Sequence, residues 1–177
     1  MDNLIAVIPA AGAGKRLGLG INKAFAKINS VPLLVHCLTM LSRTKLITRA
    51  IVVLAPDEVE EGRELLASYQ GAHFADLPFV VVAGGKERQD SVNNALAAIT
   101  ESEGYVAVHD GARPFAGKEV FERTLLAAKE HGAAIAAVSV KDTIKVVNED
   151  GEVTATPNRS TLYAVQTPQI FEVNLLK

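Results

Sequence analysis

The stretch IAVIPAAGAGKRLGLGINKAF, residues 5–25, decides the fold of this chain. It begins as an apolar run, breaks into alanine and glycine, and then presents Lys15, Arg16 and Lys23. The apolar run predicts a buried strand, and the glycine-rich part predicts a loop that follows it directly. Three cations interleaved with glycine favour a phosphate-binding loop over a plain strand-to-helix turn with solvated cations.

This loop matches neither of the two commonest phosphate-binding motifs. The fingerprint G-x-G-x-x-G requires a third glycine where the chain has Leu17. The P-loop G-x-x-x-x-G-K-[ST] requires glycine where Pro9 stands and a hydroxyl residue where Arg16 stands. The remaining interpretation is a nest of backbone N–H groups at the carboxyl end of a strand, which is where ligands bind in open α/β sheets.

Short apolar runs alternate with helical periods along most of the chain. The predicted strands are Leu4–Pro9, Ala50–Ala55, Phe79–Ala83, Tyr105–His109 and Ala133–Val140. The predicted helices are Val31–Ser42, Glu58–Ser68, Ser91–Thr100 and Lys118–His131. Such alternation predicts βαβ units, and nearly continuous apolar strands predict burial on both faces. The fold class is therefore α/β, a Rossmann-like, mostly parallel twisted sheet with helices on both faces.

Composition narrows the class of protein. The 177 residues fit one domain, residues 1–177, and the net charge of −2 lacks the basic excess of a nucleic-acid reader. Cys37 is the lone cysteine, which excludes a disulfide within the chain and favours a reducing compartment. No apolar run is long enough for a membrane span, and no basic leader precedes the first one, so we expect a cytoplasmic protein.

The alternation stops at about Lys141. From there the chain reads KDTIKVVNEDGEVTATPNRSTLYAVQTPQ, residues 141–169, which predicts two short strands around the turn sequence NEDG. This segment is polar for core material. We therefore predict a β-arm, at about residues 141–165, that projects from the domain.

A second strand end carries polar residues. The run FVVVAGGKERQDSV, residues 79–92, passes through Gly84 and Gly85 to a helix that we expect Asp90 or Ser91 to cap. Free N–H groups and a hydroxyl there suit an anion or a base edge. A simple cap beside a solvated Arg88 is the commoner arrangement for this motif taken alone.

A third strand end carries a carboxylate. The run YVAVHDGARPF, residues 105–115, closes a buried strand with Asp110 and places Arg113 three residues later. A buried carboxylate without a partner is costly, so Asp110 meets either Arg113 in a structural pair or a ligand at the sheet edge, and we favour the ligand. No metal site is indicated, because the histidines lack ligand spacing and Cys37 has no second cysteine.

Five motifs occur in an order that resembles one family. They are PAAGAGKRLGLGINK (9–23), GGKERQDSV (84–92), VHDGARP (108–114), KDTIK (141–145) and NRSTLYAVQTPQ (158–169). Together they resemble the 2-C-methyl-D-erythritol 4-phosphate cytidylyltransferases of the non-mevalonate isoprenoid pathway, from Leu4 to about Phe171. The resemblance implies a reaction in which CTP and methylerythritol phosphate give the cytidyl-diphospho alcohol and pyrophosphate.

The resemblance also implies roles for single residues. As catalytic groups, Arg16 and Lys23 would stabilise charge at the α-phosphate. The residues implied to bind the substrates are Pro9, Ala10, Ala11, Gly12, Ala13, Gly14, Gly85, Arg88, Ser91, Asp110, Gly111, Arg113, Thr143 and Arg159. Those of the first loop would wrap the nucleotide, and those of the second would lie at its cytosine and ribose. Asp110 and Arg113 would meet the acceptor and the nucleotide.

Partners and cofactor follow from the same resemblance. Mg²⁺ would be held mainly through the CTP phosphates, with no metal ligand from the protein. The arm would join two copies in a homodimer and carry Thr143 and Arg159 to the partner's acceptor site. Family members continue further, with another acceptor-binding threonine, a helix and a phosphate-positioning lysine, so we expect the C-terminal end of the family domain to be missing here.

Two alternatives stay open. The first is a cytidylyltransferase for ribitol 5-phosphate or another polyol phosphate; such enzymes tend to have AGG in the first loop, where this chain has Ala10, Ala11 and Gly12. The second is a truncated, non-catalytic CTP-binding dimer module. It would bind CTP without releasing pyrophosphate.

Overall fold

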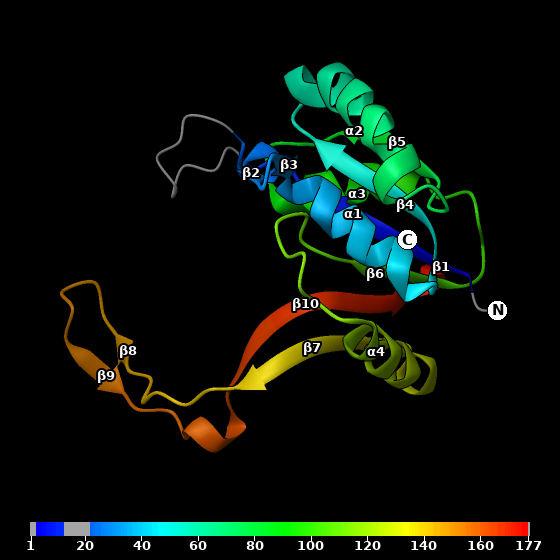
Figure 1. Ribbon diagram of the computed structural model, residues 1–177. Helices are drawn as coiled ribbons and strands as arrows, with labels where there is room; N and C mark the ends of the chain where they lie inside the picture. The colour runs from blue at the N-terminus through cyan, green and yellow to red at the C-terminus, as the bar shows by residue number, and fades with distance from the viewer. Residues whose placement is uncertain (1–2, 13–21, 177) are drawn as a thin grey trace.

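The computed structural model of the chain describes residues 3–12 and 22–176, with a six-stranded sheet at the centre (Figure 1). The strand order is β5 (Phe79–Ala83), β4 (Ile47–Leu54), β1 (Leu4–Pro9), β6 (Tyr105–Val108), β10 (Tyr163–Glu172) and β7 (Ala133–Ser139). The pairs β5–β4, β4–β1 and β1–β6 are parallel, whereas β10 runs antiparallel to both β6 and β7. The predicted mostly parallel α/β sheet is confirmed.

Helices cover both faces of this sheet, because alternate residues of a central strand point to opposite sides. On β1, Leu4, Ala6 and Ile8 belong to one apolar cluster, and Ile5 and Val7 belong to the other. The first cluster includes residues of α1 (Leu33–Thr44), α2 (Val59–His73) and α4 (Lys118–His131). The second includes residues of α3 (Arg88–Ala97) and α5 (Val173–Leu176). Burial on both faces was predicted and is confirmed for β1.

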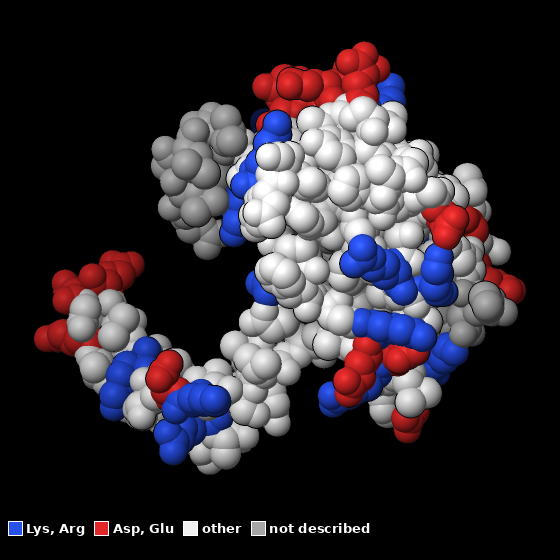
Figure 2. Space-filling model, in the orientation of Figure 1, with Lys and Arg blue, Asp and Glu red and all other residues white. Residues whose placement is uncertain are grey.

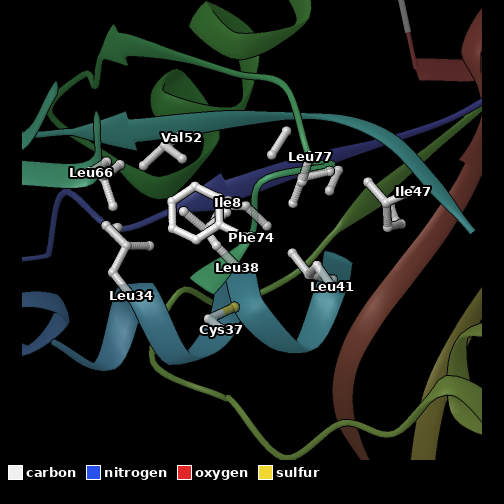
Figure 3. Packing of buried hydrophobic residues seen from close by; sticks show 14 of the residues in the cluster. Ile8, Leu34, Cys37, Leu38, Leu41, Ile47, Val52, Leu66, Phe74 and Leu77 are labelled. Carbon is white, nitrogen blue, oxygen red and sulfur yellow. The ribbon is translucent and has the colours of Figure 1, made fainter. Parts of the chain in front are cut away.

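The larger apolar cluster packs α1 against the central strands of the sheet (Figure 3). Leu34, Leu38 and Leu41 follow helical spacing along α1 and are fully buried in one cluster with Ile8 and Phe74. Burial of each such side chain contributes about 1.5–3 kcal/mol. Because α1 is held against β1, the carboxyl end of this strand starts from a well-packed position.

Some predicted boundaries shift. β1, β5 and α4 have the predicted bounds. Helix α1 begins at Leu33 because Val31–Pro32 form a short strand, β3, that pairs with β2 (Lys27–Ile28). Helix α2 continues to His73, beyond the predicted end at Ser68. The prediction that β7 is a buried parallel strand was wrong: β7 lies at the sheet edge, next to an antiparallel neighbour, with most of its residues exposed.

The predicted arm is present. β8 (Val146–Val147) and β9 (Val153–Ala155) pair antiparallel around the NEDG turn, and a short 3-10 turn, η4 (Arg159–Thr161), follows. The arm stands away from the body in Figure 1.

The strand that leads out of the arm was not predicted. β10 runs from Tyr163 back into the sheet between β6 and β7. Polar residues break its apolar run, and its ladder with β7 is itself interrupted between Val165 and Gln169. No helix in the described part of the chain is long and apolar enough to cross a membrane.

Candidate active site

Three strand ends meet at one edge of the sheet, since parallel neighbours end on the same side. The Ala10 N–H donates to the Val53 carbonyl at 2.8 Å, and the Gly84 N–H donates to the Leu54 carbonyl at 2.7 Å. The Gly111 N–H lies 3.4 Å from the Pro9 carbonyl. The loops after β1, β5 and β6 therefore lie side by side, as the sequence predicted for the carboxyl ends of parallel strands.

A charge cluster occupies this edge. Arg113 Nε donates to Asp110 Oδ2 at 2.9 Å, and Arg88 Nη2 lies 2.8 Å from Asp110 Oδ1. The second contact is an ion pair without the geometry of a hydrogen bond. The Asp110 side chain is 27% exposed, against 54% for Arg88 and 44% for Arg113. Two guanidinium groups on one carboxylate leave a surplus positive charge that faces solvent, which suits an anionic ligand.

Of the two sequence interpretations of Asp110, the structure tests the internal pair, and contact with a ligand stays a prediction. The internal pair with Arg113 exists, as the structural reading required. Arg88, which the resemblance associated with the nucleotide, joins the same carboxylate from the start of α3. A pure stability role would need one arginine, and the second makes the cluster cationic.

Buried groups hold the loop that carries Asp110. His109 is fully buried, and its Nε2 lies 2.9 Å from the Arg113 carbonyl, to which it donates. Burial lowers the pKa of His109, so the ring is neutral at pH 7 and the carbonyl selects the tautomer with the proton on Nε2. Thr167 Oγ1 accepts from the Asp110 N–H at 3.3 Å. Burial raises the pKa of Cys37 to about 12, which makes its thiol a packing group rather than a nucleophile.

The loop after β5 needs its glycines. A Cβ on Gly85 would lie 2.2 Å from the Asp90 Cβ, and one on Gly84 would lie 2.9 Å from the Ala11 Cβ. The Gly85 N–H donates to the Ser91 hydroxyl oxygen at 3.2 Å. Ser91 is buried. Its predicted contact with cytosine or ribose stays a prediction.

The predicted cap of α3 was wrong. The helix begins at Arg88 rather than Ser91, and Glu87 is its N-cap residue. The Asp90 carboxylate accepts from the Glu87 N–H at 3.0 Å, so Asp90 satisfies the cap from within the first turn. The earlier start matters for the site, because it places Arg88 at the head of the helix within reach of Asp110.

The first loop is described at its two ends. Pro9 is the last residue of β1, and Ala10, Ala11 and Gly12 follow it; a Cβ on Gly12 would meet no heavy atom of the described residues within 4 Å. Ala13, Gly14 and Arg16 lie outside the described residues, so their predicted roles stay predictions. Gly111 allows the close approach of the neighbouring loop, because its Cβ would lie 3.2 Å from the Ala10 Cβ.

The chain leaves this loop through a buried asparagine. Asn22 Nδ2 donates to the Ala10 carbonyl at 2.6 Å and to Glu58 Oε2 at 2.7 Å. Its Oδ1 accepts from the Ala24 N–H at 3.0 Å, at the start of the turn η2 (Lys23–Phe25). The Asn22 side chain thus links the two described ends of the loop by hydrogen bonds. The sequence analysis assigned it no role.

A cavity of about 930 Å³ opens beside the charge cluster. Its polar lining comes from Lys23, Arg113, Arg123, Thr124, Gln166 and Thr167, and its remaining walls are mostly alanines and apolar residues. Lys23, a predicted catalytic group, is therefore placed at the same cavity as Arg113. The volume suffices for a small phosphorylated ligand.

The arm residues lie elsewhere. Thr143 and Arg159 are exposed, and Arg159 Nη1 donates to the Lys141 carbonyl at 3.0 Å within the arm. The arm leaves the sheet at the carboxyl end of β7 and stands apart from the body (Figure 1). Among the described residues, the ion pairs of Asp110 are with Arg88 and Arg113, not with Arg159.

Sequence reasoning assigned no role to Gln166 or Thr167, although both belong to a quoted motif. Both lie on β10, the unpredicted strand, and contact the loop of Asp110 and Arg113. The available signal was an apolar strand pattern split by polar residues, YAV and QIF around QTP. Across residues 3–12 and 22–176, no three His, Cys, Asp or Glu side chains group closely enough to hold a metal ion.

Comparison with known proteins agrees with this geometry. The family model described as 2-C-methyl-D-erythritol 4-phosphate cytidylyltransferase matches residues 4–177. A protein of that name from Bacillus thuringiensis is 48% identical over 170 residues, which are 96% of this chain and 73% of the relative. Another, from Alkaliphilus oremlandii, is 40% identical over 170 residues, 96% of this chain and 71% of the relative.

Solved structures give the same result. The crystal structure of 4-diphosphocytidyl-2C-methyl-D-erythritol synthase from Anaerococcus prevotii matches with a TM-score of 0.80 and 33% identity, over 98% of this chain and 73% of that one. That of 2-C-methyl-D-erythritol 4-phosphate cytidylyltransferase from Thermus thermophilus matches with a TM-score of 0.70 and 30% identity, over 98% and 72%. The chain belongs to the 2-C-methyl-D-erythritol 4-phosphate cytidylyltransferase family.

Proposed function

We propose that this chain is a CTP-dependent cytidylyltransferase that acts on 2-C-methyl-D-erythritol 4-phosphate. The products are 4-diphosphocytidyl-2-C-methyl-D-erythritol and pyrophosphate. One observation supports the assignment beyond family membership: the cationic cluster of Arg88, Asp110 and Arg113 lies where three strand ends meet, beside a cavity that Lys23 also lines. Both substrates are phosphorylated, and this part of the fold offers them positive charge.

The reaction needs no protein nucleophile. An oxygen of the acceptor phosphate attacks the α-phosphorus of CTP and forms a new P–O bond. The bond from the α-phosphorus to the bridging oxygen breaks on the opposite side, and pyrophosphate leaves with that electron pair. The attacking phosphate is already an anion, so the protein acts by positioning and by stabilising negative charge. The neutral His109 and the protonated Cys37 of this site fit such a mechanism.

On the nucleotide side we assign the first two loops. The backbone of Pro9–Gly12 would wrap CTP, and Gly85, Arg88 and Ser91 would lie at its cytosine and ribose. From the sequence alone, Ala13 and Gly14 are assigned to the same wrapping of CTP, and Arg16 to the charge at the α-phosphate. Lys23 would stabilise the charge that develops at the α-phosphate. Loss of one such donor should lower turnover by about 10²–10³.

On the acceptor side we assign Asp110, Gly111 and Arg113, with the cavity as the seat of the sugar phosphate. Arg113 would bind the acceptor phosphate. Asp110 would accept a hydrogen bond from an acceptor hydroxyl while it orients Arg88 and Arg113. Thr143 and Arg159 are exposed on the arm, which stands apart from the body (Figure 1). We propose a homodimer in which each arm brings these residues to the other subunit's cavity, where Arg159 holds the acceptor phosphate.

Mg²⁺ is part of the same proposal. A triphosphate brings most of the oxygen ligands that Mg²⁺ prefers, so the protein has to supply few or none. Asp110, the carboxylate of the cluster, is already shared by two guanidinium groups, which fits a metal carried by CTP rather than by the protein. When bound, Mg²⁺ would neutralise and orient the phosphates. We also propose a cytoplasmic location, which the single buried Cys37 favours.

The test is release of pyrophosphate from CTP with two acceptors, methylerythritol 4-phosphate and ribitol 5-phosphate, each with Mg²⁺ and with excess EDTA. We expect release with the first acceptor only, and only with Mg²⁺. A matched Lys23→Ala variant should lose about 10²–10³ of the rate.

The other outcomes separate the alternatives. Release with ribitol 5-phosphate only would assign the chain to polyol phosphates of a different class. CTP binding by calorimetry without release from either acceptor would support a non-catalytic module. Sedimentation at several protein concentrations tests the homodimer, and a monomer at all of them would contradict it.

A further inference from the structure

Strand β10 changes its role partway along. Its pairing with β7 covers Tyr163 to Val165 and resumes at Gln169, so residues 166–168 lie in a gap of that ladder. Two of these residues turn their side chains to the loop of the charge cluster. Gln166 Oε1 accepts from Arg113 Nη1, and Thr167 Oγ1 accepts from the Asp110 N–H at 3.3 Å. The gap in the ladder thus coincides with contacts to the site.

Arg113 needs more than one partner to be ordered. Its side chain is 44% exposed, and an arginine on a flexible stem loses substantial rotamer entropy when it is held in place. Asp110 binds the Nε edge of the guanidinium at 2.9 Å. Gln166 binds Nη1, a different nitrogen of the same plane. Two contacts at two nitrogens define the orientation of the plane, which one contact does not.

The identity of residue 166 also matters for charge. Asp110 already neutralises one of the two guanidinium groups that it touches. A carboxylate at position 166 would neutralise the second and remove the surplus charge that the cluster presents. The Gln166 amide is neutral, so it orients Arg113 and leaves that surplus in place. A hydrogen bond to a charged group is also stronger than one between neutral groups.

We infer that Gln166 is a positioning residue for the acceptor site: it aims Arg113 at the acceptor phosphate without cancelling the charge of Arg113. The inference rests on the proposed function, since it assumes that the acceptor phosphate binds Arg113. Gln166 also lines the cavity assigned to the acceptor, so the double-mutant cycle below separates positioning of Arg113 from a direct contact with the acceptor. Its effect on the reaction passes through Arg113.

Kinetics with saturating CTP test this pathway. We expect Gln166→Met, which removes the amide but keeps a similar volume, to raise the KM for the acceptor about tenfold. Gln166→Glu should keep Arg113 in place but still raise that KM, because it cancels the surplus charge. An acceptor KM within twofold of wild type in both variants would overturn the inference.

A double-mutant cycle separates positioning from an independent role. In an Arg113→Ala background, Gln166→Met should change the acceptor KM by less than twofold, because the group it orients is gone. The same tenfold change in both backgrounds would overturn the inference. Gln70→Met is the matched control: Gln70 donates to the Leu77 carbonyl at 3.2 Å from α2, remote from the cluster, and its replacement should leave the KM unchanged.

A structural readout keeps the inference testable if catalysis fails. In ¹⁵N-resolved NMR spectra, the Arg113 Nε–H signal reports the order of the guanidinium without any substrate. We expect Gln166→Met to broaden or shift this signal and Gln166→Glu to preserve it, at an unchanged melting temperature. An unaltered signal in Gln166→Met overturns the inference. Absence of pyrophosphate release from the wild type would instead overturn the proposed function alone.

Discussion

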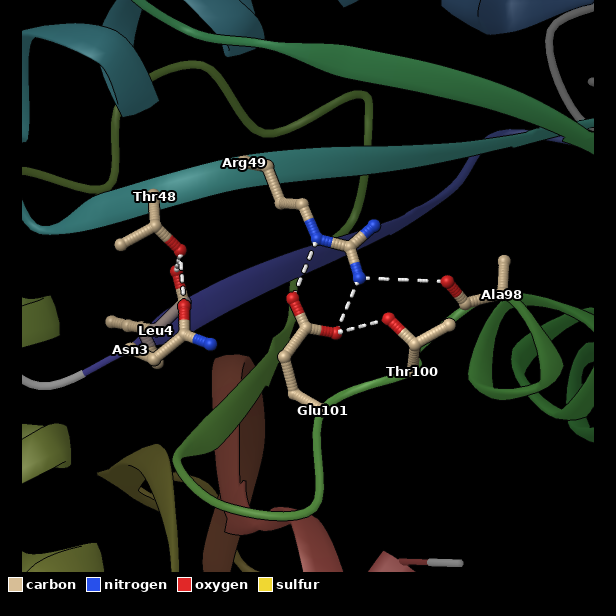
Figure 4. A network of polar contacts seen from close by, with 7 residues as sticks. All are labelled: Asn3, Leu4, Thr48, Arg49, Ala98, Thr100 and Glu101. Carbon is tan, nitrogen blue, oxygen red and sulfur yellow. Dashed lines mark hydrogen bonds and ion pairs between the residues drawn. The ribbon is translucent and has the colours of Figure 1, made fainter.

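Two carboxylates meet arginine at opposite ends of the same parallel strands. At the amino-terminal end, Glu101 accepts from Arg49 Nε at 3.2 Å and from Arg49 Nη2 at 2.7 Å (Figure 4). At the carboxyl-terminal end, Asp110 meets both Arg88 and Arg113. The first is one acid with one base in a two-point contact. The second is one acid with two bases, each bound at a single point.

The two sites also differ in how exposed their arginines are. Arg49 also donates to the Ala98 carbonyl at 3.4 Å, and its side chain and that of Glu101 are 24% and 29% exposed. The arginines of Asp110 are about twice as exposed, at 54% and 44%. The Arg49 pair is neutral and its groups are used within the chain, whereas the Asp110 cluster keeps positive charge at the surface. Figure 2 shows that the body of the molecule is hollowed on the side facing the arm. These differences fit a stability role for the Arg49–Glu101 pair and the proposed binding role for the Asp110 cluster.

The largest effect should come from the cluster of Arg88, Asp110 and Arg113, called the open cluster below. Arg113→Ala should lower pyrophosphate release by about 10²–10³, because the group proposed to position the attacking acceptor phosphate is lost. Stability should hardly change, because Arg88 still pairs with Asp110. Steady-state kinetics and urea unfolding measure the two quantities. A rate within threefold of wild type would remove Arg113 from the mechanism.

The arm should give the next largest effect, because it completes the open cluster in the proposed dimer. Arg159→Ala should raise the KM for the acceptor by about 10- to 100-fold, the value of a hydrogen bond to a charged group. CTP affinity by calorimetry should stay within twofold. Equal losses of acceptor and CTP binding would contradict the assignment, and Lys145→Ala, on the same arm, is the control.

The ion pair of Arg49 with Glu101, called the closed pair below, should affect stability rather than activity. Arg49→Ala removes the two-point contact to the partly buried Glu101, so the free energy of unfolding should fall by about 1–3 kcal/mol. Urea unfolding followed by circular dichroism measures this change. Pyrophosphate release per folded molecule should stay within twofold. A large loss of activity at unchanged stability would contradict the proposal that the Arg49–Glu101 pair serves stability and the Asp110 cluster serves binding.

Acid should weaken the closed pair by a smaller amount. The hydrogen bonds from Arg49 lower the pKa of Glu101 from 4.5 to about 2. Because the folded pKa is depressed, the stabilisation is complete above the unfolded value of about 4.5 and is lost as the pH falls toward 2. Solvent screening at this partly exposed site limits it to about 1 kcal/mol.

Urea unfolding between pH 6 and pH 2.5 tests the acid effect. Glu101→Gln, which cannot titrate, should show a shallower fall in stability across this range than wild type. Parallel curves for the two proteins would mean that other carboxylates dominate.

Local patterns predicted the elements whose boundaries are marked by neighbouring residues. β1 and β5 are apolar runs followed by glycine-containing loops, and α4 carries an apolar stripe that ends before Gly132. The rule for parallel strands then predicted that the loops with Gly85 and Asp110 share an edge. β10 was not predicted, because Gln166, Thr167 and Pro168 interrupt its apolar period. Of these residues, Gln166 and Thr167 contact the loop of Asp110 and Arg113.

By itself, the sequence determined the α/β class, the polar loops at three strand ends, the arm, and the family through the order of five motifs. Only the tertiary structure decided that Arg88 shares Asp110, that Asn22 clips the first loop, and that Gln166 holds Arg113. The physical reason is distance along the chain. Strand and helix periods come from residues a few positions apart, whereas Gln166 and Arg113 are 53 positions apart and meet only because β10 returns beside β6.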